Sequence, residues 1–133
     1  MRILLDTHIF LWWDSQPEQL SLQAKSLCQD PANELILSVA SVWEMQVKQQ
    51  IGKLSLRLPL DKLIEEQRQS NGLEILPVRL SHALALEALP LHHRDPCDRM
   101  LIAQAKAENM SLLSADPMFK QYDVTLLGQE PSP

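Results

Sequence analysis

The sequence begins Met-Arg-Ile-Leu-Leu-Asp-Thr-His (residues 1–8). Ile3, Leu4 and Leu5 form a short apolar run, which is typical of a strand buried on both faces of a sheet. The run stops abruptly at Asp6. A carboxylate at the carboxyl end of a central strand lies where open α/β sheets place their chemistry. This stretch therefore predicts both a parallel sheet and a site at one of its edges.

The rest of the chain alternates between strand-like and helix-like segments. Further strands are predicted at 34–38, 73–78, 111–114 and 124–127, and helices at 7–13, 20–29, 39–51, 60–70, 81–89 and 95–109. Pro77 places the strand over 73–78 at a sheet edge. Strands separated by helices indicate right-handed parallel crossovers. The predicted fold is a three-layer α/β/α sandwich with a central, mainly parallel, five-stranded sheet.

One apolar stripe stands out in the helix predicted before Gly52. Its members recur at a spacing of four residues: Val39, Trp43, Val47 and Ile51. Residues at this spacing share one helix face, so we expect the stripe to pack on the sheet.

The length and composition of the chain suit one globular domain. A chain of 133 residues with 45% hydrophobic residues has the length and composition of a single domain, which we assign to residues 1–128, with a flexible tail over 129–133. No apolar run approaches the roughly 20 residues that cross a bilayer, and the N-terminus lacks a signal-peptide pattern. Cys28 and Cys97 lack metal-ligand spacing and suggest reduced core thiols, so the expected compartment is the cytoplasm.

The net charge of −5 argues against a general nucleic-acid binder, because phosphate neutralisation requires Lys and Arg. It does not argue against a nuclease, since a carboxylate site gains its positive charge from a bound metal ion. The remaining basic residues are scattered, and no phosphate track is predicted from them: Lys53, Arg57, Arg79 and Arg94.

Further acids occur where a parallel sheet would gather them. Asp116 follows the strand over 111–114 much as Asp6 follows its own strand, so both should emerge side by side. Asp98 lies at a helix start, on the face that continues through apolar residues and turns inward. Glu44 lies within two turns of the end of the strand over 34–38.

Each acid also has a purely structural interpretation. Asp6 suits a helix cap, and Glu44 suits an ion pair with Lys48 at the i, i+4 spacing, worth only about 0.3–0.5 kcal/mol. Asp95, before Pro96, is better explained as a cap than as a site residue, and Asp116 has the same cap-like position. For Asp6 and Glu44 the residue pattern alone leaves both interpretations open.

Several carboxylates in one cleft repel one another and resist ionising together. Hard divalent cations relieve this conflict, and Mg²⁺ and Mn²⁺ prefer oxygen ligands. Such an ion lowers the pKa of water and neutralises charge on a phosphodiester. The chemistry that follows is metal-dependent hydrolysis of a nucleic-acid backbone.

Four segments resemble, in order and spacing, the motifs of PIN-domain ribonucleases, above all the VapC-type toxins of bacterial type II toxin–antitoxin pairs. They are LLDTH (4–8), SVWEM (41–45), DPCDRMLIAQA (95–105) and LLSADPMF (112–119). The resemblance implies that the catalytic and metal-binding residues, around Mg²⁺ or Mn²⁺, are Asp6, Glu44, Asp98 and Asp116. It also implies RNA cleavage by metal-activated water, a homodimer, and a cognate antitoxin that covers the site.

Other residues are expected to support this quartet. Ser114 stands where the family often has Thr, which keeps the hydroxyl. We expect Thr7 to hydrogen-bond a metal-ligating carboxylate or its water. Asp95, Arg99 and Lys48 should lie near the quartet, with Arg99 balancing the acids rather than contacting substrate phosphate.

The histidines and tryptophans are given more ordinary roles. We expect His8 to be packed against apolar neighbours, and His92 and His93 to lie in a loop before the site, where they would meet RNA. None is assigned as a general base, because metal-activated water needs none. At helical spacing the tryptophans favour core or dimer contacts over stacking on bases: Trp12, Trp13 and Trp43.

Two other enzyme classes fit poorly. A haloacid-dehalogenase-type phosphatase requires a second acid two residues after Asp6, where His8 stands, and a response-regulator receiver requires an acidic pair that residues 1–8 lack. The main alternative is a catalytically silent PIN-like module that binds RNA or protein. Loss of one of the four acids would mark it, and all four are present.

Overall fold

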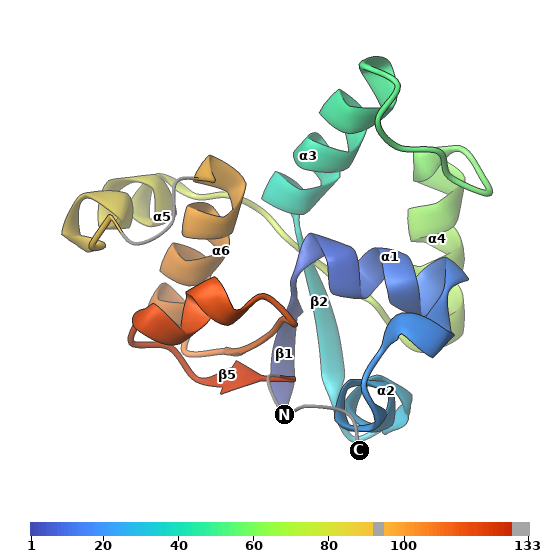
Figure 1. Cartoon of the computed structure of the whole chain (residues 1–133), viewed down its shortest axis with the longest axis horizontal. Helices are drawn as coiled ribbons and strands as arrows, with labels where there is room; N and C mark the ends of the chain where they lie inside the picture. Colours follow the sequence, from blue (N-terminus) through green and yellow to red (C-terminus); the bar gives the residue numbers. More distant parts are fainter. Residues whose placement is uncertain (92–94, 129–133) are drawn as a thin grey trace.

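A sheet of five parallel strands runs through the centre of the molecule (Figure 1). The structure is a computed structural model, and it describes residues 1–91 and 95–128. The strands are β1 (Arg2–Leu5), β2 (Glu34–Ser38), β3 (Glu74–Leu76), β4 (Ser111–Leu113) and β5 (Leu126–Leu127). Their order is β3-β2-β1-β4-β5, so the predicted parallel sheet and the edge position of β3 are confirmed.

Helices connect the strands and cover both faces of the sheet. They are α1 (Thr7–Ser15), α2 (Leu22–Gln29), α3 (Val39–Gln50), α4 (Leu60–Asn71), α5 (Leu80–Ala85) and α6 (Pro96–Ala107). Short 3-10 turns add η1 (Pro17–Gln19), η2 (Leu86–Ala88) and η3 (Pro117–Gln121). The predicted helix over 20–29 begins only at Leu22, because the Ser21 hydroxyl caps it by accepting from the Ala24 amide at 3.0 Å. The helix predicted over 81–89 is divided between α5 and η2.

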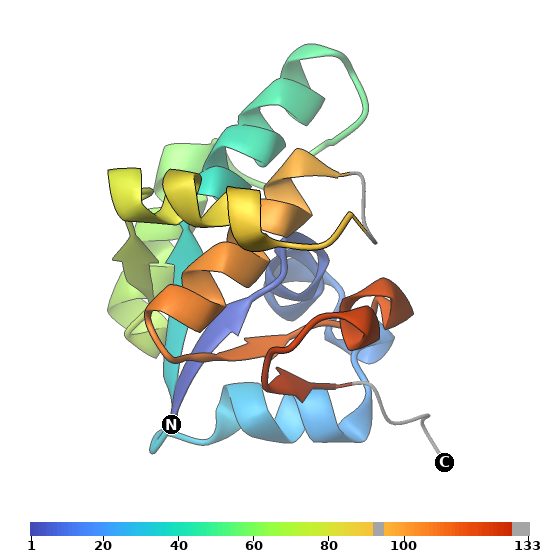
Figure 2. The same ribbon diagram turned by 90° about the vertical axis from the view of Figure 1, so that its left-hand side faces the viewer.

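Alternation along the strands creates two cores. Ile3 and Leu5 pack on one side with residues of α1, α2 and α4, whereas Leu4 packs on the other side with residues of α6. Figure 2 shows α6 lying on this second face of the sheet, with α5 beside it. Both faces are therefore covered, as a parallel sheet requires, and the three-layer prediction is confirmed.

The prediction that the stripe on α3 packs on the sheet is wrong. Val39, Trp43, Val47 and Ile51 are all exposed, Trp43 to 60%. The buried residues of α3 are Ala40, Ser41 and Met45. The cause is the direct passage from β2 into α3, after which the helix projects beyond the end of the sheet (Figure 1).

Three smaller observations complete the fold. Cys28 and Cys97 are free and buried, as predicted. Among the helices of residues 1–91 and 95–128, none is both long and apolar enough to cross a membrane. The expectations for His92 and His93, and for a flexible tail over 129–133, concern residues outside those that the structure describes.

Candidate active site

The carboxyl ends of β1 and β4 are joined through a serine hydroxyl. Ser114 Oγ donates to Asp6 Oδ2 at 2.8 Å and accepts from the Asp116 amide at 3.0 Å. Asp6 is 5% exposed and occupies the N-cap position of α1, but its side chain makes no capping hydrogen bond to the second or third residue of that helix, so capping does not account for this buried carboxylate. Burial raises the pKa of Asp6, although the hydrogen bond from Ser114 and the nearby His8 oppose this shift.

Asp116 and Asp6 line the same hollow, of about 310 Å³. Asp116 is partly buried, and its Oδ1 accepts from the Met118 amide at 2.9 Å at the start of η3. The expected cap is thus present, and the same carboxylate lies beside Asp6. The expectation that the two acids emerge side by side is met by this geometry.

Asp98 is placed by the first turn of α6. The Asp95 carboxylate caps this helix by accepting from the Asp98 amide at 3.0 Å, as predicted. The Asp98 side chain is partly buried. Burial, followed by the negative charges of Asp6, Asp95, Glu44 and Asp116, raises the pKa of Asp98 to about 8. The four other acids are therefore close enough to act on this one carboxyl.

Glu44 enters the cluster from α3. Its carboxylate forms the predicted ion pair with Lys48 at 3.4 Å. Oxygens of Glu44 and Asp95 and the sulfur of Cys97 also lie within 4.8 Å of one another. The Cys97 thiol donates to the Ala40 carbonyl at 3.4 Å, and burial together with the neighbouring acids raises its pKa, so it remains a protonated thiol.

The donor set fits a hard divalent cation. Asp6, Glu44, Asp98 and Asp116 offer carboxylate oxygens from four separate segments, and Mg²⁺ and Mn²⁺ bind such oxygens. Burial, followed by the negative charges of the neighbouring acids, raises the pKa of Asp98 and so disfavours ionisation of this carboxyl unless positive charge is added. A dication would supply that charge.

Two supporting residues have different partners from those expected. Thr7 Oγ1 donates to Ser41 Oγ at 2.9 Å, a buried hydrogen bond that joins α1 to α3, so the expected contact of Thr7 with a carboxylate is made by its backbone amide, which hydrogen-bonds Asp6. Arg99 donates to backbone carbonyls, with the shortest distance 2.9 Å to Pro90, instead of balancing the acids. Both residues thus hold the scaffold around the site.

His8 is the residue that the sequence placed least well. It is exposed rather than packed, and it lines the same hollow as Asp6 and Asp116. Its ring lies 5.9 Å from that of Trp12, measured between centroids. The i, i+4 spacing of His8 and Trp12 was the signal that both rings share one face of α1.

A family model described as PIN domain matches residues 3–124. The chain belongs to the PIN-domain family. Ribonuclease VapC22 of Mycobacterium tuberculosis is 26% identical to this PIN domain over 121 residues, which are 90% of this chain and 91% of the relative.

Solved structures show the same fold. VapBC2 from Rickettsia felis, in a structure described as bound to a DNA fragment from the promoter, superposes with a TM-score of 0.66 at 20% identity, over 95% of this chain and 97% of the other. FitAcB from Neisseria gonorrhoeae superposes with a TM-score of 0.63 at 21% identity, over 93% and 95% of the two chains. At these identities the likeness concerns the architecture of the PIN domain.

Proposed function

We propose that this PIN domain is a metal-dependent endoribonuclease and the toxin of a toxin–antitoxin pair. The observation that carries the proposal is the convergence of Asp6, Glu44, Asp98 and Asp116 on one side of the sheet. The similarity to VapC22, which is named a ribonuclease, supports RNA as the substrate. The four acids are assigned as the catalytic and metal-binding residues.

A bound Mg²⁺ or Mn²⁺ supplies positive charge that lowers the pKa of water and offsets charge on the phosphodiester. Ser114 fixes the orientation of Asp6 through its 2.8 Å hydrogen bond. Asp98 presents its carboxylate at the start of α6, where the helix dipole favours negative charge. Asp95 positions Asp98 by capping that turn, and Glu44 completes the ring of acids from α3.

Partner proteins form a second part of the proposal. The structure of VapBC-5 from Mycobacterium tuberculosis is described as a member of the VapBC family of toxin–antitoxin systems, and a Klebsiella pneumoniae structure of the same fold is described as a toxin–antitoxin complex. Both support a cognate antitoxin for this chain. We also propose a homodimer through the exposed apolar side of α3. There Val39 and Trp43, with Val78, Pro96 and Met100, line an apolar hollow of about 420 Å³. Exposed apolar surfaces of this kind mark protein interfaces.

The homodimer is tested by light scattering of the purified chain. Trp43→Ser should convert a dimer to a monomer without unfolding it, because the side chain is 60% exposed. Leu22→Ser removes another exposed apolar residue, on α2, and should leave the dimer intact. A monomeric wild-type chain would refute this part of the proposal.

A catalytically silent PIN-like module that binds RNA or protein is the alternative. It predicts that at least one acid of the quartet is missing, and the sequence has all four, which favours hydrolysis. The proposal also includes a cytoplasmic location and either Mg²⁺ or Mn²⁺ as the ion. Anomalous scattering from a crystal soaked in Mn²⁺ would address the ion and its ligands.

The decisive experiment is an RNA cleavage assay. Purified protein is incubated with structured RNAs and Mg²⁺ or Mn²⁺, and cleavage should disappear with a chelator and in Asp6→Asn. Asp123→Asn changes an exposed acid outside the cluster and should leave cleavage unchanged. Activity that persists in Asp6→Asn, or in the presence of the chelator, would overturn the assignment.

A further inference from the structure

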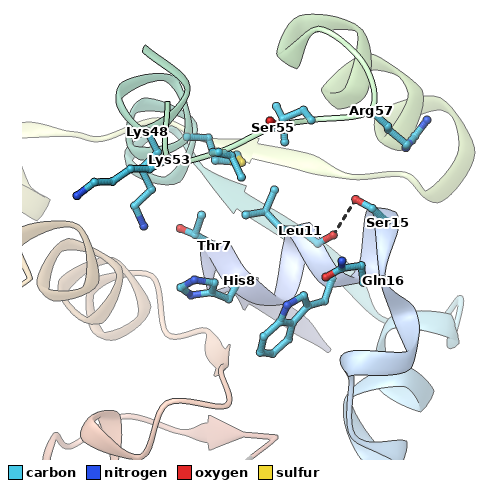
Figure 3. Close-up of a pocket in the computed structure, with 13 residues that line it drawn as sticks. Thr7, His8, Leu11, Ser15, Gln16, Lys48, Lys53, Ser55 and Arg57 are labelled. Carbon is cyan, nitrogen blue, oxygen red and sulfur yellow. Dashed lines mark hydrogen bonds between the residues drawn. The ribbon is translucent and has the colours of Figure 1, made fainter. Parts of the chain in front are cut away.

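A groove of about 380 Å³ lies beside the acidic cluster, between α1 and the segment that joins α3 to α4 (Figure 3). We call it the cationic groove, and its polar and aromatic lining includes His8, Trp12, Lys48, Lys53 and Arg57. His8 and Trp12 also line the hollow that contains Asp6 and Asp116. The two depressions therefore share one aromatic rim, formed by His8 and Trp12. A polymer bound at the acidic cluster and extending over this rim would enter the cationic groove.

The backbone of the two lysines is fixed by the end of α3. Gly52 adopts a φ of +75°, and its amide donates to the Gln49 carbonyl at 3.1 Å, while the Lys53 amide donates to the Lys48 carbonyl at 2.8 Å. This pair of hydrogen bonds is a Schellman motif, which fixes the residues that follow a helix. Figure 3 shows the side chains of Lys48 and Lys53 extending toward the same end of the groove as the ring of His8.

The three cations of the groove differ in what already neutralises them. Arg57 donates to Asp14 and to Glu66, at 2.7 Å in each case, so its charge is used inside the protein. Lys48 shares its charge with Glu44 at 3.4 Å. Lys53 is exposed and has no ion pair within residues 1–91 and 95–128. Lys53 is therefore the cation best placed to meet an anion from outside.

The cationic groove has aromatic rings at its rim as well as cations. The planes of His8 and Trp12 are tilted by 39°, and their centroids are 5.9 Å apart. His8 is exposed and Trp12 is partly buried, so both rings are accessible to a ligand in the groove. Proteins that bind single-stranded nucleic acid typically have a groove in which cations contact the phosphate backbone and aromatic rings stack on the bases.

We propose that the cationic groove binds the single-stranded RNA segment adjoining the scissile bond. Lys53, assisted by Lys48, contacts a backbone phosphate, and the His8–Trp12 rim receives an unstacked base. A duplex fits poorly, because its bases are already stacked and unavailable to the rim. This inference rests on the proposed ribonuclease function and adds to it the residues that hold the substrate outside the acidic cluster.

The first test is binding of a fluorescent unstructured RNA 12-mer, followed by anisotropy in a chelator so that no metal-dependent cleavage occurs. Lys53→Ala should weaken binding by about tenfold and lower the slope of log affinity against log salt by about one. The matched control is Lys106→Ala, an exposed lysine at the far end of α6, which should bind like the wild type. His8→Ala, also at an exposed position, should weaken binding by about fivefold or more through lost stacking.

The second test is cleavage kinetics with the metal ion present. Lys53→Ala should raise KM while leaving kcat within about twofold, since uniform substrate binding is lost and the chemistry is kept. The same RNA annealed to its complement should bind more weakly than the single strand.

The outcomes separate the inference from the proposed function. RNA binding that depends on Lys53, without any cleavage, supports the groove and refutes the ribonuclease. Cleavage that is identical in wild type, Lys53→Ala and Lys106→Ala supports the ribonuclease and overturns the groove. Unchanged RNA affinity in Lys53→Ala, combined with weaker binding of a protein partner, would assign the groove to that partner and also overturn the inference.

Discussion

Asp98→Asn should make the metal-free protein more stable while abolishing its activity. The Asp98 carboxyl titrates near 8 in the folded chain, against 3.8 for an ordinary aspartate, because it is buried among like charges. The folded state therefore keeps a proton that the unfolded state has lost. The wild-type free energy of unfolding should fall as the pH rises from about 4 to about 8, and then level off. Asn carries no titratable group, so the free energy of unfolding of Asp98→Asn should not fall in this way.

The magnitude follows from the size of the shift. A difference of about four pH units corresponds to roughly 6 kcal/mol at about 1.4 kcal/mol per unit. Solvent reaches this partly buried side chain and screens the repulsion, and Asn forfeits a favourable interaction of about 0.5 kcal/mol with the start of α6. We therefore expect Asp98→Asn to exceed the wild type by about 2–3 kcal/mol near pH 8 and by almost nothing near pH 4.

The assay is urea unfolding in a chelator at several values between about pH 4 and about pH 8.5, where the two-state free energy is compared at each pH. Asp123→Asn is the matched control, and its difference from wild type should stay within about 0.5 kcal/mol at every pH. Millimolar Mg²⁺ should then stabilise the wild type far more than Asp98→Asn. Parallel pH profiles of the wild type and Asp98→Asn would refute the electrostatic argument.

Three further predictions concern residues that support the site and the fold. Ser114→Ala should lower kcat by about tenfold, because Asp6 loses the donor that orients it, whereas Ser114→Thr should keep most activity in single-turnover kinetics. His82→Ala should lower the free energy of unfolding in urea by about 2–4 kcal/mol, because its fully buried ring is hydrogen-bonded to Glu108 at 2.9 Å and to the Arg79 amide at 3.0 Å. A decrease under about 1 kcal/mol would contradict this role. Gly52→Ala should cost about 1–2 kcal/mol in thermal unfolding, entirely through the backbone, because no atom lies within 4 Å of the added Cβ; Gly52→Asn should cost less.

The sheet could be predicted because local and global signals agree there. The strand predicted over 34–38 has the same bounds as β2, since its apolar run is buried on both faces of the sheet. The helix over 60–70 likewise ends where Gly72 adopts a φ of +65°. Asp6 and Asp116 follow from the same logic, because the carboxyl ends of parallel strands β1 and β4 meet at one edge.

The α3 stripe shows where this logic ends. Periodicity identifies an apolar helix face, but it does not state what covers that face. Here β2 runs straight into α3, so the helix buries its Ala40, Ser41 and Met45 face and leaves Trp43 outside. The same limit applies to the basic residues, which looked scattered. Lys53 and Arg57 meet α1 only because the segment after Gly52 turns back beside it.

The acidic cluster links the stability of the folded chain to metal binding and to proton release. Asp6 and Asp98 each have a pKa raised by burial, so ionising these carboxyls in the apo protein costs free energy that its hydrophobic core must offset. An ion that binds only the folded chain releases protons and stabilises by RT ln(1 + [ion]/Kd), which is about 2.7 kcal/mol at a hundredfold excess over Kd. Release of roughly one proton per ion near pH 7 would therefore accompany binding, and calorimetry in buffers of different ionisation enthalpy would measure it. An ion that bound without proton release would have to be held elsewhere than among these carboxyls.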